Sequence, residues 1–160
     1  MPKTEFVYVT YIRTTPEKLW EALTQEEFTR QYWSASISDW NKGSPWKLVF
    51  ADGRIADAGE VLEVDRPRRL VLKWRNEWNP ELKAEGYTRC TFEIEHENEM
   101  VKLTVTHEAE RPLKLIDAVS GGWPWVLSGL KSLLETGTAL PRRIDCPGAD
   151  HERTTRSHAR

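Results

Sequence analysis

Cysteine is scarce in this sequence, and it has no long uninterrupted apolar segment. Cys90 and Cys146 are the only cysteines, so a disulfide is not expected, and their spacing is unlike that of a zinc site. No apolar run reaches the roughly 18 residues of a membrane helix, and the start MPKTEF lacks the features of a signal peptide. We therefore expect a cytoplasmic chain without a membrane span.

An excess of charge of one sign is also missing. The 23 basic and 25 acidic residues leave a net charge of −2, which argues against nucleic acid as a partner because such binding normally needs a basic face. A length of 160 residues suggests one domain. We expect that domain to span residues 1–139, because the segment 140–160 is polar and is predicted to be disordered.

Tryptophan is abundant, with eight in this short chain. The side chain is large and amphipathic, and it concentrates in cores, pockets and interfaces. A core that needs large residues explains any one of the eight, but a purely structural role for all of them is a weaker interpretation.

The first part of the chain predicts a strand followed by two short helices. The segment 5–13 is rich in β-branched and aromatic residues, and both of its faces are apolar, so we expect cover on both sides. Thr15 can cap a helix with Pro16 at its first position. The segment TQEE at 24–27 is typical of a capping box that opens the second helix.

The middle of the chain alternates with period two and predicts five or six antiparallel strands with one apolar face. A long C-terminal helix follows, with Pro124 in its first turn and Gly137 at its end. The apolar face of the sheet needs this helix as cover, so the fold class is α+β, a curved sheet wrapped around the helix. The residues predicted to point inward from the later strands include Trp46, Leu48, Phe50, Leu70, Leu72, Trp74, Cys90, Phe92, Ile94, His96, Val101, Leu103, Val105 and His107.

Several phrases, in this order, resemble the SRPBCC (START-like, helix-grip) superfamily, in its branch similar to the C-terminal domain of the activator of the heat-shock protein 90 ATPase. The phrases are TPEKLWEALT (15–24), GEVLEVDRPRRLVLKW (59–74), TFEIE (91–95), VKLTVTHE (101–108) and GGWPWVLSGLKSLLETG (121–137). The resemblance implies a helix-grip fold with a deep cavity between sheet and helix, which the superfamily uses for hydrophobic molecules. It supplies no catalytic set.

The expected cavity would be lined by aromatic and apolar side chains, which in another interpretation simply fill the core. The candidate lining residues are Trp20, Tyr32, Trp33, Trp46, Leu48, Phe50, Leu72, Trp74, Phe92, Leu103, His107, Trp123 and Leu127.

Trp123 and Trp125 point in different directions on a helix, because residues two apart lie nearly opposite each other. We expect Trp123 in the core. Trp125 lies in line with the small residues Ser128, Gly129 and Ser132, and we expect it at a cavity mouth or an interface with a second subunit.

The leading hypothesis is therefore a protein that binds a hydrophobic or aromatic small molecule and acts by sequestration or delivery. One rival is a chaperone-associated interaction module with a role in stress response, using Trp125 and the link 76–86. Another is an enzyme on a polyketide-like substrate, with His96, His107 or Glu60 as acid or base. No catalytic signature, cofactor site or metal site is expected, although Cys90, His96 and His107 are all predicted to point to the inner face of the sheet.

Overall fold

The structure is a computed structural model that describes residues 4–141. Its fold is α+β, with seven antiparallel strands in the order β1-β7-β6-β5-β4-β3-β2, as the fold class predicted. Cys146 and all but the first two residues of the predicted disordered tail, 140–160, lie outside the described residues. The elements are β1 (Glu5–Ile12), α1 (Pro16–Thr24), α2 (Glu26–Tyr32), β2 (Ala35–Ser38), β3 (Pro45–Val49), β4 (Ile55–Asp65), β5 (Arg69–Asn76), α3 (Pro80–Lys83), β6 (Thr88–Glu97), β7 (Met100–Glu108) and α4 (Lys114–Thr136).

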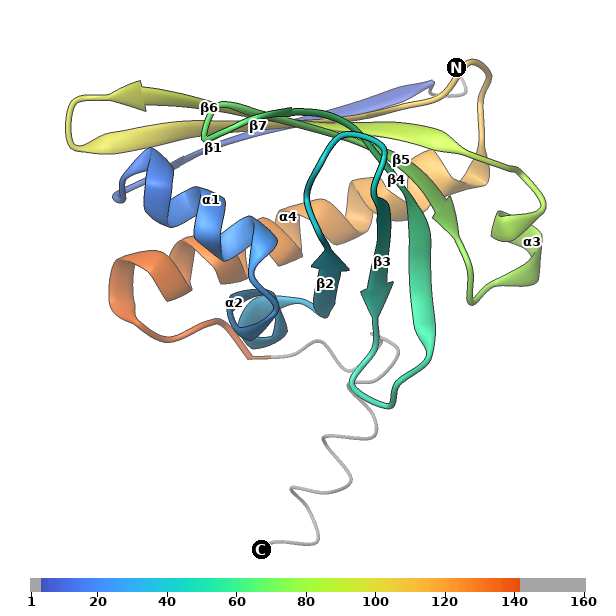
Figure 1. The fold of residues 1–160 in the computed structure, drawn as a ribbon, viewed down its shortest axis with the longest axis horizontal. Helices are drawn as coiled ribbons and strands as arrows, with labels where there is room; N and C mark the ends of the chain where they lie inside the picture. Colours follow the sequence, from blue (N-terminus) through green and yellow to red (C-terminus); the bar gives the residue numbers. More distant parts are fainter. Residues whose placement is uncertain (1–3, 142–160) are drawn as a thin grey trace, which may run out of the picture.

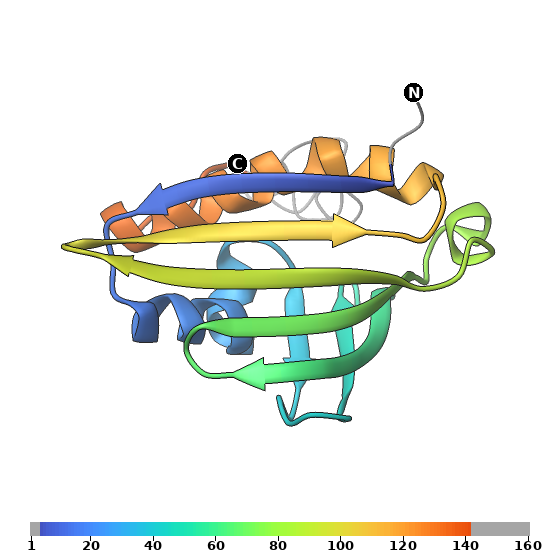
Figure 2. The ribbon, with the colours of Figure 1, turned by 90° about the horizontal axis from the view of Figure 1, so that it is seen from above.

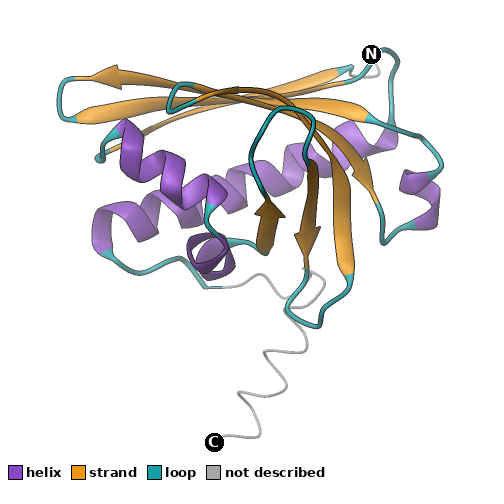
Figure 3. Cartoon of the chain, viewed as in Figure 1, coloured by secondary structure: helices purple, strands orange, loops and turns teal. Residues whose placement is uncertain are grey.

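The sheet is strongly curved and holds the helices on its concave side. In Figure 1, β1, β7 and β6 run above α4, while β2 and β3 lie in front of it. Figure 2 shows the strands from above, with the helices beneath them. The secondary-structure colouring of Figure 3 separates a strand layer from α1, α2 and α4. Since the apolar side chains of the strands and of α4 face each other, the core fills the space between them.

The first strand is covered on one face only, so the expectation of cover on both faces is wrong. Val7, Val9 and Tyr11 are 44–47% exposed, whereas Ile12 is fully buried. The reason is position in the sheet: β1 is an edge strand paired only with β7, and the helices pack on one side of it. Alternation in the burial pattern of β1 follows directly from this one-sided cover.

The start of α1 agrees with the sequence, but the start of α2 does not. The Thr15 hydroxyl accepts a hydrogen bond from the backbone N–H of Lys18, as a helix cap does. Thr24, in contrast, is the last residue of α1, and its hydroxyl donates to the Trp20 carbonyl instead of capping α2. The predicted capping box is therefore wrong, because Gln25 and not Thr24 occupies the cap position of α2.

The long helix begins at Lys114, ten residues before Pro124, so the prediction that Pro124 lies in the first turn is wrong. Pro124 lies inside α4, and Gly137 ends it in the left-handed conformation, with φ of 85°. The first turn is held by a residue distant in sequence, because the Glu85 carboxylate accepts from the backbone N–H groups of Lys114 and Leu115. Leu115 and Ile116 are buried beside this turn, and the helix continues through Pro124 although proline has no backbone N–H to donate.

Among residues 4–141, no helix combines the length and the apolar character that crossing a membrane requires.

Candidate ligand-binding site

Four tryptophans and one histidine gather between the sheet and α4, and we call them the tryptophan cluster: Trp33, Trp46, Trp74, Trp123 and His107. Trp74 is at its centre. The centroid of its ring lies 4.5 Å from that of Trp46, 5.1 Å from His107, 5.7 Å from Trp123 and 6.0 Å from Trp33. Most of these ring pairs are tilted or edge-on, the geometry that aromatic quadrupoles favour.

The close approach of Trp46 and Trp74 depends on a glycine between them. Gly59 of β4 is the direct partner of Trp46 on β3 and also of Trp74 on β5. A Cβ atom at position 59 would lie 1.7 Å from the carbonyl oxygen of Lys73, which belongs to the backbone of β5. Glycine at this position therefore lets β4 and β5 come close together where the two tryptophans flank it.

His107 is fully buried and has hydrogen-bond partners on both ring nitrogens. Trp123 Nε1 donates to His107 Nδ1 at 3.3 Å, so Nδ1 acts as an acceptor. The proton then belongs on Nε2, which lies 2.8 Å from the Thr88 hydroxyl; that hydroxyl donates to the Trp74 carbonyl at 3.2 Å. Burial lowers the pKa of His107 to about 3. A neutral, fully bonded imidazole of this kind orients Trp123 and Thr88 rather than exchanging protons with water.

Asp57 is a buried carboxyl on the other side of Trp74. Its Oδ1 accepts a hydrogen bond from Trp74 Nε1 at 2.9 Å, and the residue is 8% exposed. Burial raises the pKa of Asp57 to about 7; the Trp74 hydrogen bond acts in the opposite direction, and the nearby Glu77 charge raises the pKa further.

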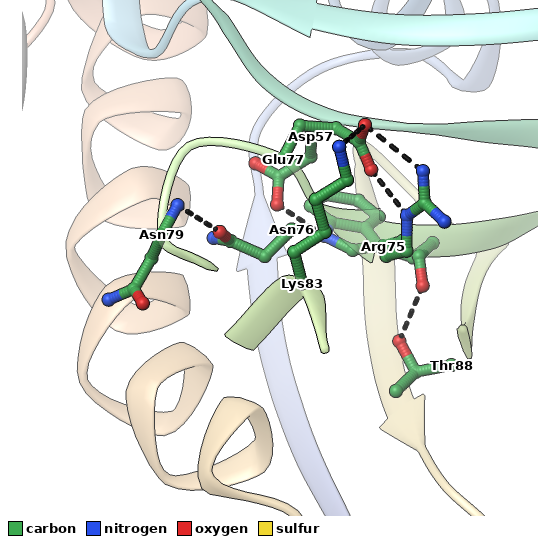
Figure 4. A network of polar contacts seen from close by, with 8 residues as sticks. Asp57, Arg75, Asn76, Glu77, Asn79, Lys83 and Thr88 are labelled. Carbon is green, nitrogen blue, oxygen red and sulfur yellow. Dashed lines mark hydrogen bonds and ion pairs between the residues drawn. The ribbon is translucent and has the colours of Figure 1, made fainter. Parts of the chain in front are cut away.

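The cations at this end of β5 are already paired. Figure 4 shows Glu77 bonded to both Arg75 and Lys83. The Arg75 Nε–Glu77 Oε2 distance is 2.5 Å, and the Lys83 Nζ–Glu77 Oε1 distance is 3.5 Å. In the same view, Asn76 Oδ1 accepts from the backbone N–H of Asn79. Both cations therefore pair with Glu77 and not with Asp57, which keeps only its tryptophan donor among the described residues.

Nearly all the predicted lining residues lie in the interior, but Trp33 is only partly buried at the margin of the cluster. The Nε1 atom of Trp20 is buried and has no hydrogen-bond partner among the described residues, while the Arg66 guanidinium lies 5.8 Å from the centroid of its ring. The lining residues that are buried are Trp20, Tyr32, Trp46, Leu48, Phe50, Leu72, Trp74, Phe92, Leu103, His107, Trp123 and Leu127. That they line a ligand site stays a prediction.

Two of the three acid or base candidates are not in the interior. His96 is exposed near the end of β6, beyond the cover of the helices. The prediction that it points into the interior is therefore wrong. Glu60 is exposed on β4, so it cannot act on a molecule held in the interior. Asp57, the buried carboxyl that does contact the cluster, has no clear sequence signal, because it lies between alanines in a strand without apolar alternation.

Gly129, one of the small residues in line with Trp125, faces another helix of the same chain. A Cβ atom at the buried Gly129 would lie 3.4 Å from Tyr32 Cβ, so α2 packs on α4 at this point. Trp125 itself is partly buried and packs against the core. Its placement at a cavity mouth or a subunit interface stays a prediction.

Residues 13–135 match the family described as Activator of Hsp90 ATPase homolog 1-like protein. No curated protein matches the chain.

Solved structures share the fold at low sequence identity. The protein MLL2253 from Mesorhizobium loti is similar with a TM-score of 0.71 and 23% identity, covering 81% of this chain and 96% of that one. The Aha1 dimer from Colwellia psychrerythraea has a TM-score of 0.67 and 20% identity, covering 84% and 98%. PFC0360w, an HSP90 activator from Plasmodium falciparum, has a TM-score of 0.65 and 22% identity, covering 82% and 96%. At these identities the likeness shows the fold alone.

Proposed function

Because the chain belongs to the Activator of Hsp90 ATPase homolog 1-like protein family, we propose that it uses the helix-grip fold to bind an apolar or aromatic small molecule at the tryptophan cluster. The observation that carries this proposal is the convergence of three tryptophan rings and the His107 ring on Trp74, whose indole N–H donates to Asp57. Ligand sites in proteins combine such apolar and aromatic walls with a few fixed polar groups. The role that follows is sequestration or delivery.

Trp33 is the side chain through which a ligand would reach the cluster. It lies between α2 and β2, outside both elements, and its ring covers Trp74 at 6.0 Å and Trp123 at 5.3 Å. Trp33 is partly buried, whereas Trp46, Trp74 and Trp123 are buried, so its ring is the cluster tryptophan with the most contact with solvent. Entry of a ligand beside Trp33 is therefore the route that we propose.

Binding can be tested with naphthalene, a neutral aromatic probe, and the indole N–H signals of the protein in solution NMR. We expect naphthalene to shift the signals of Trp74 and Trp123, which lie in the cluster, and to leave that of Trp78, which is 41% exposed and contacts Phe50 instead. Trp74→Phe should weaken binding about tenfold, because the ring that the others contact becomes smaller.

Trp78→Phe is the matched control, since it makes the same chemical change outside the cluster. Each variant must first show a cooperative unfolding transition, because truncating a buried tryptophan also lowers stability. Shifts confined to Trp78, or equal affinity in wild type and a folded Trp74→Phe variant, would contradict the proposed site.

A second candidate function is a contact with a chaperone of the heat-shock protein 90 type. The family name favours it, and one similar structure is described as an HSP90 activator. Trp78 and Tyr87, 41% and 46% exposed, flank α3 within and beside the link 76–86, and they offer apolar contacts on the surface. The purified chain should then raise the ATPase rate of such a chaperone, and Trp78→Ala should reduce the effect. An unchanged rate together with no detectable complex would exclude this candidate.

A further inference from the structure

The position of Asp57 is difficult to explain if the ligand of the tryptophan cluster is neutral. A buried carboxylate normally has a cationic partner or several hydrogen bonds, because leaving water is otherwise costly. Within residues 4–141, no lysine, arginine or histidine forms an ion pair with Asp57, and Trp74 Nε1 is its side-chain partner. Arg75 and Lys83 are both held by Glu77.

The surroundings of this carboxyl are those of a site for a cation. The faces of tryptophan rings attract positive charge more strongly than other aromatic side chains do. Trp74, which donates to Asp57, is in ring contact with Trp46 and Trp33. An anionic ligand would be repelled by the Asp57 carboxylate itself, which has no cationic side chain bonded to it within residues 4–141.

We propose that the ligand of the tryptophan cluster carries a substituted ammonium group, which lies against the Asp57 carboxylate and the adjoining tryptophan rings. This inference rests on the proposed function, since it names the chemical class of the molecule bound there. The positive charge supplies the partner that Asp57 lacks, and the substituents on nitrogen contact the rings. The raised pKa of Asp57 agrees with this role, because an empty site holds a carboxyl that ionises more readily once a cation arrives.

Two probes of the same shape separate charge from aromatic character. Phenyltrimethylammonium and tert-butylbenzene differ only in nitrogen against carbon, so one is a cation and the other is neutral. We expect the cation to bind wild-type protein at least tenfold more tightly, with shifts of the Trp74 indole signal. Asp57→Asn should bring the two affinities close together. Asp65→Asn, an exposed carboxyl on the same strand, should leave the preference unchanged.

Each outcome of this experiment bears on a different statement. Preference for the cation that disappears in Asp57→Asn supports the inference. If tert-butylbenzene shifts the Trp74 signal and the cation binds no more tightly, the ammonium inference is overturned while the proposed function stands. If neither probe shifts Trp74, while both variants remain folded, the proposed function fails together with the inference. If Asp57→Asn still prefers phenyltrimethylammonium, the inference that the Asp57 carboxylate binds the ammonium group is overturned.

Discussion

Asp57→Asn is expected to raise the free energy of unfolding near neutral pH, by an amount that grows to about 4 kcal/mol as the pH increases. Burial raises the pKa of Asp57 from its ordinary 3.8 to about 7. The folded chain therefore keeps a proton that the unfolded chain releases. The contribution of the Asp57 carboxyl to the free energy of unfolding is fully present below pH 3.8 and is lost as the pH rises through about 7. Asparagine carries no charge, and its oxygen can still accept from Trp74 Nε1.

His107 acts with the opposite sign in the same protein. Burial lowers its pKa from 6.5 to about 3, so the unfolded chain takes up a proton that the folded chain does not. Stability from His107 is present above pH 6.5 and is lost as the pH falls towards 3. In wild-type protein the two effects offset each other in the window that they share. Because both proteins contain His107, the difference between Asp57→Asn and wild type isolates the carboxyl.

The measurement is urea unfolding of wild type and Asp57→Asn at several pH values from about 3 to 8. Glu77 and Cys90 also face this region, but both are the same in the two proteins, and burial raises the pKa of the Cys90 thiol so that it stays neutral. Asp65→Asn is the control, and we expect it to change stability by less than about 0.5 kcal/mol throughout. A stability difference that does not change with pH would show that Asp57 is ionised at no cost.

Taken together with the ligand experiment, this result separates function from folding. Asp57→Asn is expected to gain stability and to lose the preference for the ammonium probe. Replacing a residue that only supports the fold would lower both the stability of the protein and its preference for the ammonium probe. A variant that gains stability and loses ligand preference is typical of a site where binding requires a group that destabilises the fold.

The aromatic part of the candidate site could be predicted from the sequence, because it depends on local alternation. Trp46, Trp74 and Phe92 occupy inward positions of period-two strands, and each is buried. His96 has the same parity and is exposed, since parity gives the face of a strand and not the extent of the cover above it. The family resemblance added the helix-grip arrangement, which the structure has.

The polar part of the site could not be predicted, because it depends on contacts between distant segments. Asp57 lies between Ala56 and Ala58, and its strand contains a register shift between Val61 and Glu63 that breaks simple counting. Likewise, α4 begins at Lys114 because Glu85 accepts from its first backbone N–H groups. Neither contact can be predicted from the spacing of residues or from composition.

Gly59→Ala is expected to lower the free energy of unfolding by about 3 kcal/mol or more. The new Cβ would lie 1.7 Å from the Lys73 carbonyl oxygen and 2.6 Å from the Lys73 carbonyl carbon. Both are backbone atoms of β5, so no side-chain rotation relieves the contact, and the two strands must separate. That separation moves Trp74 relative to Trp46, because both are register partners of Gly59.

Gly129→Ala is the matched control, since it adds the same methyl group at another glycine inside a regular element, here the buried Gly129 of α4. Its Cβ would lie 3.4 Å from Tyr32 Cβ, an ordinary contact, and alanine is favoured over glycine in a helix by up to about 1 kcal/mol. We therefore expect Gly129→Ala to retain or slightly increase stability in urea unfolding, while Gly59→Ala loses it. Because Gly59 fixes the spacing of two cluster tryptophans, the tryptophan fluorescence of the folded fraction should also change in Gly59→Ala alone. Equal unfolding midpoints for the two variants would mean that β4 and β5 can separate at this point without cost, and that the cluster does not depend on their close approach.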